Sequence, residues 1–323
     1  MAAARWIVAG ALVPALLAPQ LLNLFWTGLL IQIFVFGLFA LSVDLLVGHA
    51  GILPMGHAAF FAVAAYTAAI LEVRHAVAFL PAAAAGILAA AVFGMVFGVS
   101  VRTGGVYFIL VTLAMGHVVW GVLTRWTSFT GGDNGVSNVP LPALGPIQFM
   151  SLSTYYYLAL AVVVLCALGY RVLVRSPFGL ALHGIRESES RMRGLGYQTR
   201  AHKYAAFVLS AGLAGVAGVL YAHWNRFVSP ATANFQVSAE VVLMVCLGGP
   251  RTILGPFIGA AVILAIRSYL SGYLVQWMMV MGAVFIATVL WAPDGIMGLA
   301  TRWGARRGTA ASVPAPQAMA APE

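Results

Sequence analysis

The stretch Phe178–Lys203, FGLALHGIRESESRMRGLGYQTRAHK, is a polar segment in a chain that otherwise carries almost no charge. The 323-residue sequence is 62% hydrophobic and 8% charged, and long apolar runs precede and follow this segment. Only Glu187 and Glu189 accompany its basic residues. The basic residues in and just before it are Arg171, Arg175, Arg186, Arg191, Arg193, Arg200 and Lys203. Because cationic loops stay on the cytoplasmic face of a membrane, the sequence predicts an all-α polytopic membrane protein with a cytoplasmic loop here.

Composition excludes several classes of protein. Soluble domains are about a quarter charged, so a globular cytosolic protein is excluded. The net charge of +9 fits membrane topology and contact with anionic lipid headgroups, because no basic stripe suggests a nucleic-acid partner. Cys166 and Cys246 lie in apolar runs without metal-ligand spacing, so we expect no metal site and no bound cofactor.

The apolar runs predict about ten spanning helices, since a helix needs about 20 residues to cross a bilayer. The candidates are Trp6–Leu22, Leu29–Val47, His57–Leu71, Val77–Ser100, Gly105–Leu123, Tyr155–Val174, Tyr204–Ala222, Ala239–Leu247, Ile253–Leu270 and Leu274–Trp291. The third and the eighth are short, and each alone would fit a half-helix or a re-entrant segment. Counting both as crossings places the basic loop and both termini on the cytoplasmic side.

We expect one transmembrane domain, residues 1–303, followed by an Ala- and Pro-rich tail, 304–323, that is disordered in the cytoplasm. The N-terminal run is similar to a signal peptide, but its poor cleavage site favours a retained first span. Within the domain, the cytoplasmic loop covers 175–203 and an exterior loop covers 124–154. The exterior loop is rich in turn residues. It would cap a cavity, meet an external partner or serve as a plain connector.

Two stretches interrupted by Gly and Pro are candidate parts of a solute path. They are GHAGILPMGH, Gly48–His57, and GGPRTILGP, Gly248–Pro256. A broken helix survives in a membrane only where protein or a water-filled cavity covers it, and such breaks mark substrate paths in transporters. The alternative is a pair of tight cytoplasmic turns. The candidate path residues are Asp44, Gly51, Met55, Gly56, His57, Glu240, Gly248, Gly249 and Gly255.

Asp44 and Glu240 lie beside these two breaks. Ionisable groups within spans are functional candidates because their burial is costly. Each carboxylate would either hydrogen-bond backbone N–H groups freed by the break or bind a polar solute, and we prefer the first role. A proton relay would need a row of carboxylates along one face, which the sequence does not show.

The cytoplasmic loop has a helical pattern. The apolar residues Phe178, Leu182, Ile185 and Met192 fall on one helix face. The i, i+4 pairs Glu187–Arg191 and Glu189–Arg193 would stabilise the same helix. Ser176-Pro177 predicts its start, and Gly194 or Gly196 its end. A short amphipathic helix suits docking into a partner's groove, whereas a lipid-surface helix would not explain the two glutamates.

No motif predicts an enzyme. The sequence holds no phosphate-binding G-x-x-x-x-G-K-[ST] loop, so this chain is not itself a P-loop ATPase. Metalloprotease H-E-x-x-H and lipase-type G-x-S-x-G motifs do not occur either.

Several blocks of this sequence, in order, resemble those of LivM-type permeases, the membrane subunits of ABC importers for branched-chain amino acids and related small solutes. The blocks are GHAGILPMGHAAFFAVAAYTAAIL, TGGDNGVSNVP, SPFGLALHGIRESESRMRGLGYQTRAHKYAAFVLSAGLAGVAGVLYAH, SAEVVLMVCLGGPRTILGPFIGAAVI and WAPDGIMGL. Pro54-Met55 and Pro250-Arg251 depart from the usual pattern, and both lie in the broken segments. The departures put the substrate in doubt and leave the transport role intact.

The resemblance implies a multi-pass permease of the bacterial cytoplasmic (inner) membrane. It would pair with a LivH-type permease, two LivG/LivF-type ATPases that carry ATP and Mg, and a periplasmic substrate-binding protein. The polar loop then corresponds to a coupling helix seated in a cleft of an ATPase subunit. Its candidate coupling residues are Phe178, Ile185, Arg186, Glu187, Arg191, Gly194 and Gly196.

Other functions stay open. A permease of the same family for urea, short amides or aromatic acids is one alternative. An ion-coupled secondary transporter is another, and it would work without a cytoplasmic ATPase. A membrane-embedded enzyme would need a catalytic constellation that the sequence lacks.

Overall fold

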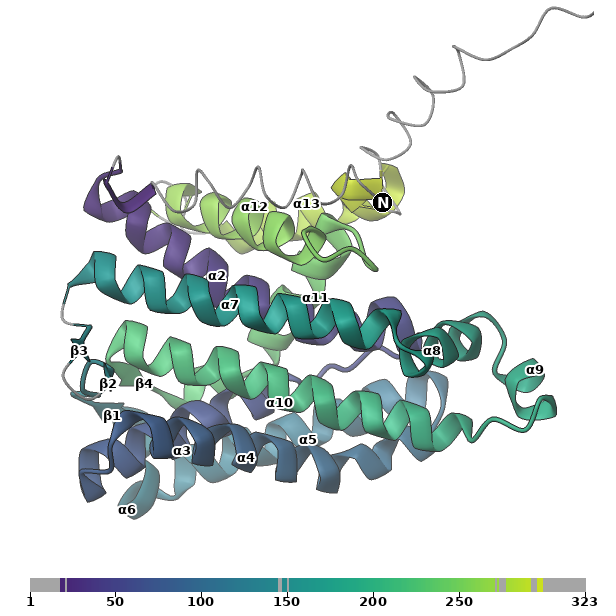
Figure 1. The fold of residues 1–323 in the computed structure, drawn as a ribbon, viewed down its shortest axis with the longest axis horizontal. Coiled ribbons are helices and arrows are strands. Elements are labelled where there is room, and N and C mark those ends of the chain that lie inside the picture. The colour runs from purple at the N-terminus through teal and green to yellow at the C-terminus, as the bar shows by residue number, and fades with distance from the viewer. Residues whose placement is uncertain are drawn as a thin grey trace, which may run out of the picture.

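The chain folds into a bundle of long helices in the computed structural model, which describes residues 18–20, 22–144, 147–149, 151–270, 272, 277–291 and 295–298 (Figure 1). The first half contains α2 (Leu24–Asp44), η1 (Leu45–Ala50), α3 (Ala58–His75), α4 (Phe79–Phe97), η2 (Gly98–Arg102), α5 (Gly105–Arg125), α6 (Thr127–Thr130), η3 (Gly132–Asn134), β1 (Val136–Ser137), β2 (Ala143–Leu144), β3 (Ile147–Gln148) and α7 (Leu152–Arg175). The second half contains α8 (Pro177–Glu187), α9 (Glu189–Gly194), α10 (Thr199–Asn225), β4 (Phe227–Val228), η4 (Pro230–Ala233), α11 (Phe235–Gly248), α12 (Gly255–Leu270) and α13 (Trp277–Trp291).

Six helices in the described part of the chain are long and apolar enough to cross a membrane. They are Leu24–Ala50, Ala58–His75, Phe79–Arg102, Gly105–Arg125, Leu152–Arg175 and Thr199–Asn225. The helices α11 and α12 are apolar but shorter. The prediction of an α-helical polytopic membrane protein is therefore confirmed, while ten crossings are not established. Most of the predicted first span, Trp6–Leu22, and the whole tail 304–323 lie outside the described residues.

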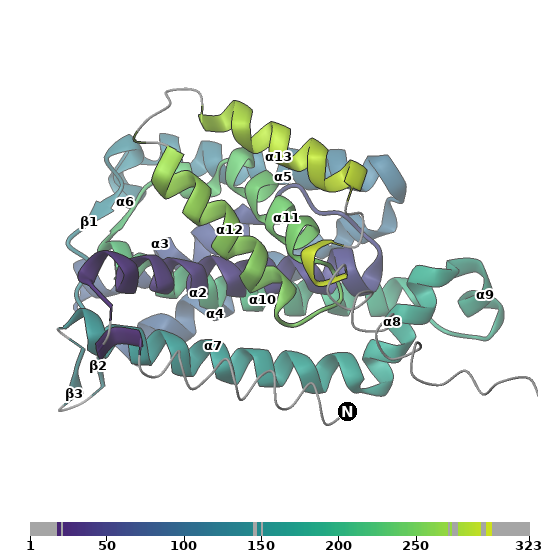
Figure 2. The ribbon, with the colours of Figure 1, turned by 90° about the horizontal axis from the view of Figure 1, so that it is seen from above.

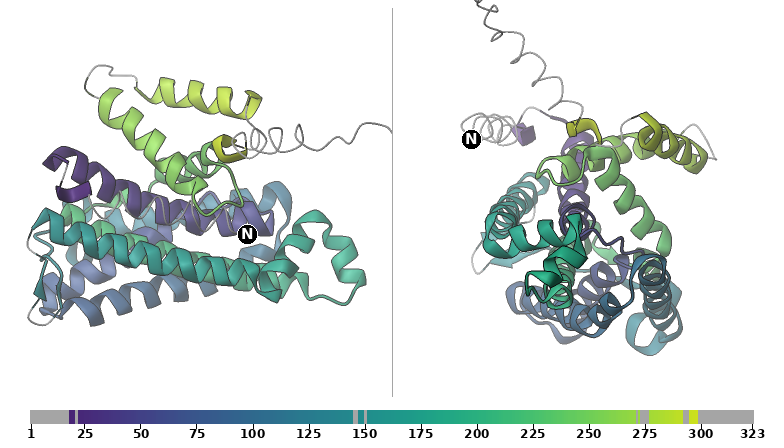
Figure 3. Two further views of the ribbon diagram at one scale, coloured as in Figure 1. Left: turned by 45° about the horizontal axis from the view of Figure 1, so that its top comes forward. Right: turned by 90° about the vertical axis from the view of Figure 1, so that its right-hand side faces the viewer.

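The long helices run side by side between two ends of the molecule. The strands and α6 gather at one end, and α8 and α9 lie at the other (Figure 1). From another angle, α8 and α9 extend beyond the ends of the long helices (Figure 3). The polar segment of the sequence is thus set apart from the apolar bundle.

The centre of the bundle is built around α10, which packs against both α2 and α3. In α2, Leu38, Phe39 and Leu41 are completely buried. Apolar side chains lie on all sides of this helix, which is usual for a helix that neighbours surround in a core. The outer helices α4 and α7 instead expose apolar side chains such as Leu88 and Leu165, which are 64% and 71% exposed. Such faces suit contact with lipid.

The third predicted span is longer than expected. The prediction ended it at Leu71, whereas α3 continues to His75 and has 18 residues, a length of about 27 Å. Its last turn includes Glu72, which lies 2.9 Å from His223 of α10. Packing and this buried pair allow the helix to continue past the apolar run.

The short helix α11 begins inside the protein. The backbone N–H of Ala58, at the start of α3, donates to Ser238 Oγ near the start of α11 at 2.9 Å. Both residues are buried. From this junction the two helices run to opposite ends of the bundle, and α11 lies with α12 and α13 on one side of α2 (Figure 2).

The exterior loop 124–154 is tied to the segment that follows α10. Val136 of β1 pairs with Val228 of β4, and Ser137 pairs with Phe227, in an antiparallel ladder. Arg74 at the end of α3 donates to the carbonyl oxygen of Ser128 at 2.8 Å. The loop therefore closes one end of the bundle.

Candidate functional site

The first broken segment begins where α2 loosens into the π-helical turn η1. Gly51 ends this turn in the left-handed region, with φ of +69°. A side chain there would be strained, and its Cβ would lie 2.9 Å from Cγ of Arg186. π-Helical turns inside α-helices are frequent at functional sites. The predicted break is therefore present, and glycine suits position 51 because the backbone there has a positive φ.

The second broken segment separates α11 from α12. Gly249 follows α11 with φ of +109°, a conformation that favours glycine. A Cβ on Gly248 would run into the carbonyl oxygen of Gly255, so the two helices approach backbone to backbone. Thr252 Oγ1 accepts from the N–H of Gly255 at 3.0 Å and closes the turn. These contacts explain the glycines through packing alone.

Asp44 joins the two breaks. Its Oδ1 accepts from the backbone N–H of Arg251 at 2.9 Å, and its Oδ2 accepts from the hydroxyl of Tyr170 at 2.7 Å. The residue is completely buried. A Cβ on Gly48 would overlap Oδ1 of Asp44. Asp44 thus accepts from a backbone N–H that the break in the other half of the chain has freed, as expected for the role that we prefer.

Met55, Gly56 and His57 lead into α3 and are held by side chains of neighbouring helices. The N–H of Met55 donates to Thr112 Oγ1 at 3.1 Å. A Cβ on Gly56 would meet the carbonyl oxygen of Thr112, so α5 lies directly against this backbone. His57 Nε2 lies 2.9 Å from Ser210 Oγ and is 1% exposed. The structure thus places His57 in the packed interior.

Glu240 lies apart from Asp44, in a cavity of about 220 Å³ between α2, α10, α11, α12 and η4. Its Oε1 is 3.6 Å from Nη1 of Arg267 on α12. The predicted path residues are therefore not gathered in one place. Asp44 meets the second break near Arg251, Met55 and Gly56 lie against Thr112 of α5, and Glu240 faces a cavity of its own.

The polar loop folds into two helices and not one. Ser176 caps α8 by accepting from the N–H of Gly179, and Pro177 is its first residue, as predicted. At Ser188 the backbone is extended, and this side chain accepts from the N–H of Arg191 to start α9. The continuous helix was a wrong prediction, because the serine caps a new helix where the pattern alone would continue the first. Gly194 ends α9 and Gly196 has φ of +86°, so the predicted stop is confirmed.

The apolar face of α8 packs against the chain's own helices. Leu182 is completely buried and Ile185 is 2% exposed, while Phe178 stacks on His202. Ile185 was predicted to face a partner, and its burial corrects that assignment. The exposed coupling candidates are Glu187, Arg191, Gly194 and Gly196.

Arg186 connects α8 to the first break. Its Nη1 donates to the carbonyl oxygen of Gly48, within η1. Because Gly48 also contacts Asp44, a chain of contacts runs from the polar loop to both broken segments. Arg186 thus links α8 directly to the backbone of η1.

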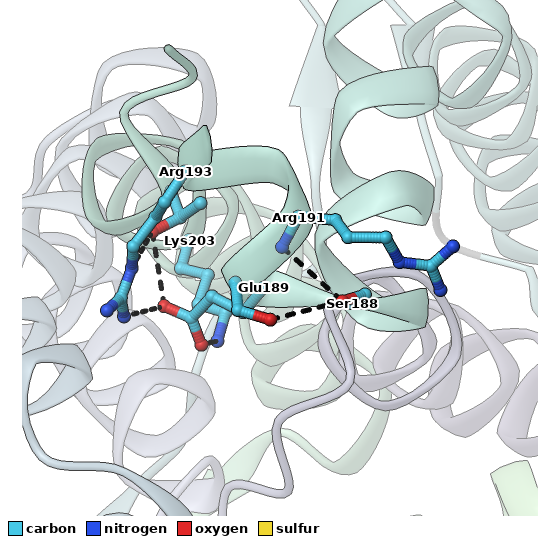
Figure 4. A network of polar contacts seen from close by, with 7 residues as sticks. Ser188, Glu189, Arg191, Arg193 and Lys203 are labelled. Atoms are coloured by element: carbon cyan, nitrogen blue, oxygen red, sulfur yellow. Dashed lines mark hydrogen bonds and ion pairs between the residues drawn. The ribbon is translucent and has the colours of Figure 1, made fainter. Parts of the chain in front are cut away.

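Glu189 holds α9 against the start of α10 (Figure 4). It accepts from Arg193 at 2.5 Å, from Lys203 at 2.7 Å and from Thr199 at 3.1 Å. Partial burial alone would raise the pKa of Glu189, but the hydrogen bonds from Lys203 and Arg193 outweigh it and lower the pKa to about 2. The stabilising contribution is therefore complete above the ordinary carboxyl pKa and is lost as the pH falls towards 2.

Several polar partners were not predicted. Glu72 and His223 form a buried pair between α3 and α10, and the ring nitrogen Nδ1 of His223 lies 2.7 Å from the carbonyl oxygen of Val219. The prediction missed this pair because it ended the third span at Leu71, so that Glu72 was not considered as a residue within a span. Ser238 and Tyr170 carried no signal in the sequence, since their partners are distant along the chain.

The buried helices, the lipid-facing outer helices and the two broken segments define a polytopic membrane protein of the transporter class. The chain matches the family model described as branched-chain amino acid transport system, permease component, over residues 25–289. The chain therefore belongs to this family of permease components.

Individual relatives agree with this placement. The chain is 33% identical over 284 residues to the high-affinity branched-chain amino acid transport system permease protein LivM of Escherichia coli (strain K12), and the match covers 80% of this chain and 66% of that protein. It is 32% identical over 282 residues to LivM of Salmonella typhimurium, with the same coverage. A probable branched-chain amino acid transport permease protein LivH of Methanocaldococcus jannaschii is 28% identical over 207 residues, 59% of this chain and 63% of that protein. The chain thus spans about two thirds of the length of these relatives. No solved structure matches it.

Proposed function

We propose that this chain is a permease subunit of an ABC importer and forms, with a LivH-type partner, the translocation path for branched-chain amino acids or related small solutes. ATP hydrolysis would take place on two LivG/LivF-type ATPases, and a periplasmic binding protein would deliver the solute. The protein would lie in the bacterial cytoplasmic membrane with about ten crossings. The family membership supports the transport role, and urea, short amides or aromatic acids remain alternative substrates.

The observation that carries this proposal is the contact between Arg186 and the carbonyl oxygen of Gly48. It joins the protruding α8–α9 segment to η1, and Asp44 joins η1 to the second break. A ligand or partner shifts a two-state protein only through contacts that differ between the states. An ATPase that pulls on α8 and α9 would change the position of both broken segments through these contacts.

The coupling residues would have two different roles, because some of them are exposed and one contacts the chain itself. Glu187 and Arg191 are exposed and would contact the ATPase. Arg186 is half-buried and faces the chain itself, so it would transmit the movement. The glycine breaks, with Met55 and His57 beside them, would border the path or support its walls.

The test uses the complete complex, purified with its partner permease and ATPases and reconstituted with the binding protein. We expect the Glu187→Ala, Arg191→Ala double variant to lose at least tenfold of the co-purified ATPase. We expect Arg186→Met to retain the ATPase and to lose transport. Arg200→Ala, a change at an exposed arginine of the same loop, is the matched control.

Two results would overturn the assignment. Normal co-purification and transport by the double variant would exclude the exposed residues as the docking surface.

Cysteine labelling tests the topology in a variant without the two native cysteines. Asn134 should react from the exterior and Ser190 from the cytoplasm, and the reverse pattern would contradict the proposed orientation.

A further inference from the structure

The cavity that contains Glu240 is small and is lined by both polar and apolar residues. It has a volume of about 220 Å³. Its polar lining includes Ser229, Thr232, Asn234 and Gln236, and Phe36 and Phe61 form an apolar wall. Both an apolar surface and hydrogen-bonding groups are therefore available to one small molecule.

The cavity contains one side chain of each charge. Glu240 is 9% exposed, and its Oε1 has no hydrogen-bond partner among the described residues. The guanidinium of Arg267 is 3.6 Å from this oxygen, longer than a hydrogen bond. The Arg267 side chain is 46% exposed and therefore has room to turn aside.

We propose that this cavity is a binding subsite for the head group of a zwitterionic α-amino acid with a small aliphatic side chain. Glu240 binds the ammonium group and Arg267 binds the carboxylate. The aliphatic side chain lies against Phe36 and Phe61. The inference rests on the proposed transport function and adds the recognition chemistry to it.

The size of the cavity agrees with this ligand. One water molecule occupies about 30 Å³ of liquid. A cavity of about 220 Å³ therefore has room for several waters, which a small aliphatic amino acid would displace. Drug-sized ligands need larger pockets.

The position of the cavity suits an outward-facing subsite. Tyr221 and Arg267 lie near the ends of α10 and α12, and Ser229 follows β4. Since β4 pairs with β1 of the exterior loop, the cavity lies toward the end opposite α8 and α9. Glu240 also follows Ser238, which holds the junction between α3 and α11. A bound solute would thus lie beside α3 and α11.

A purely structural role for the Glu240–Arg267 pair is less consistent with the contacts. The helices α11 and α12 already meet backbone to backbone, because a Cβ on Gly259 would overlap the carbonyl oxygen of Met244. A long, half-exposed ion pair adds little to such an interface. A buried carboxylate oxygen without a hydrogen bond is costly, and an ammonium group would satisfy it.

The test measures leucine binding to the purified permease pair, with 4-methylpentanoate and isopentylamine as competitors that lack the amine or the carboxylate. We expect the wild type to prefer leucine at least tenfold over both analogues. Glu240→Gln should weaken leucine binding at least tenfold and leave 4-methylpentanoate binding less affected. Arg267→Lys, which keeps the charge and loses the planar fork, should weaken leucine less than Glu240→Gln.

The control is Asp133→Asn, the same loss of charge at an exposed residue of the exterior loop, which should bind leucine as the wild type does. Melting temperature and size-exclusion profile verify that each variant is folded. Equal leucine binding by wild type and Glu240→Gln would overturn the subsite. So would equal binding of leucine and its analogues by the wild type. Failure of the intact complex to transport any small solute would instead overturn the proposed function.

Discussion

Asp44 and Glu240 occupy similar places in the sequence, each beside a broken helix, yet their surroundings differ. Asp44 is completely buried, and both of its oxygens accept hydrogen bonds from the protein, one from Arg251 and one from Tyr170. Glu240 faces a cavity with one oxygen that no described group satisfies. The first carboxylate bonds to groups of the protein itself, and the second faces a cavity in which we propose that a solute binds. A carboxylate next to a break therefore has no fixed role until its partners are known.

The largest expected effect is that of Asp44→Ala on stability. The change leaves the Tyr170 hydroxyl and the Arg251 N–H without their acceptor, and each buried donor that loses its partner costs about 1–3 kcal/mol. With two such donors, we expect the free energy of unfolding to fall by about 2–6 kcal/mol. Thermal unfolding of the purified protein in detergent measures the effect. An unchanged melting temperature would refute the structural role of Asp44.

A smaller effect is expected for Tyr170→Phe. This variant keeps the ring that packs beside His49 and removes only the hydroxyl that donates to Asp44. The loss of one hydrogen bond to a charged group should lower the free energy of unfolding by about 1.5–3 kcal/mol. The same unfolding assay applies. A loss equal to that of Asp44→Ala would show that the bond to Arg251 contributes nothing.

The smallest effect on stability is expected for Glu240→Gln. Its ion pair with Arg267 is long and partly exposed, and such pairs contribute about 0–1 kcal/mol. We expect the melting temperature to stay close to that of the wild type while leucine binding falls. A large loss of stability would make Glu240 similar to Asp44 and would remove the distinction between the two sites.

The sequence predicted the elements that depend on local chemistry. The start of α8 at Ser176-Pro177 and the end of α9 at Gly194 follow from capping and helix-breaking residues, which act over a few positions. The long apolar runs predicted the six long spanning helices, because the length and hydropathy of a run can be read directly from the sequence. The division at Ser188 was missed, because a serine in a helical pattern either continues the helix or caps the next one.

The contacts of the site were beyond prediction because they are distant along the chain. Asp44 and Arg251 are 207 residues apart, and Ala58 and Ser238 are 180 residues apart. No periodicity relates such positions. Glu240 was recognised as an ionisable residue within a span, but its pairing with Arg267 depends on how α11 and α12 pack. The burial of Ile185 likewise depends on how α8 packs against its neighbours.

The long separation of these partners also has a consequence for the order of synthesis. Asp44, His57 and Ala58 leave the ribosome in the first half of the chain, whereas Arg251, Ser210 and Ser238 follow much later. At about 5–20 residues per second, the 207 residues between Asp44 and Arg251 take about 10–40 seconds to make. During that interval the polar groups of the first half lack their final partners inside the membrane. The growing chain therefore has to keep them hydrated or shielded by the insertion machinery, and its second half completes the hydrogen bonding of its first.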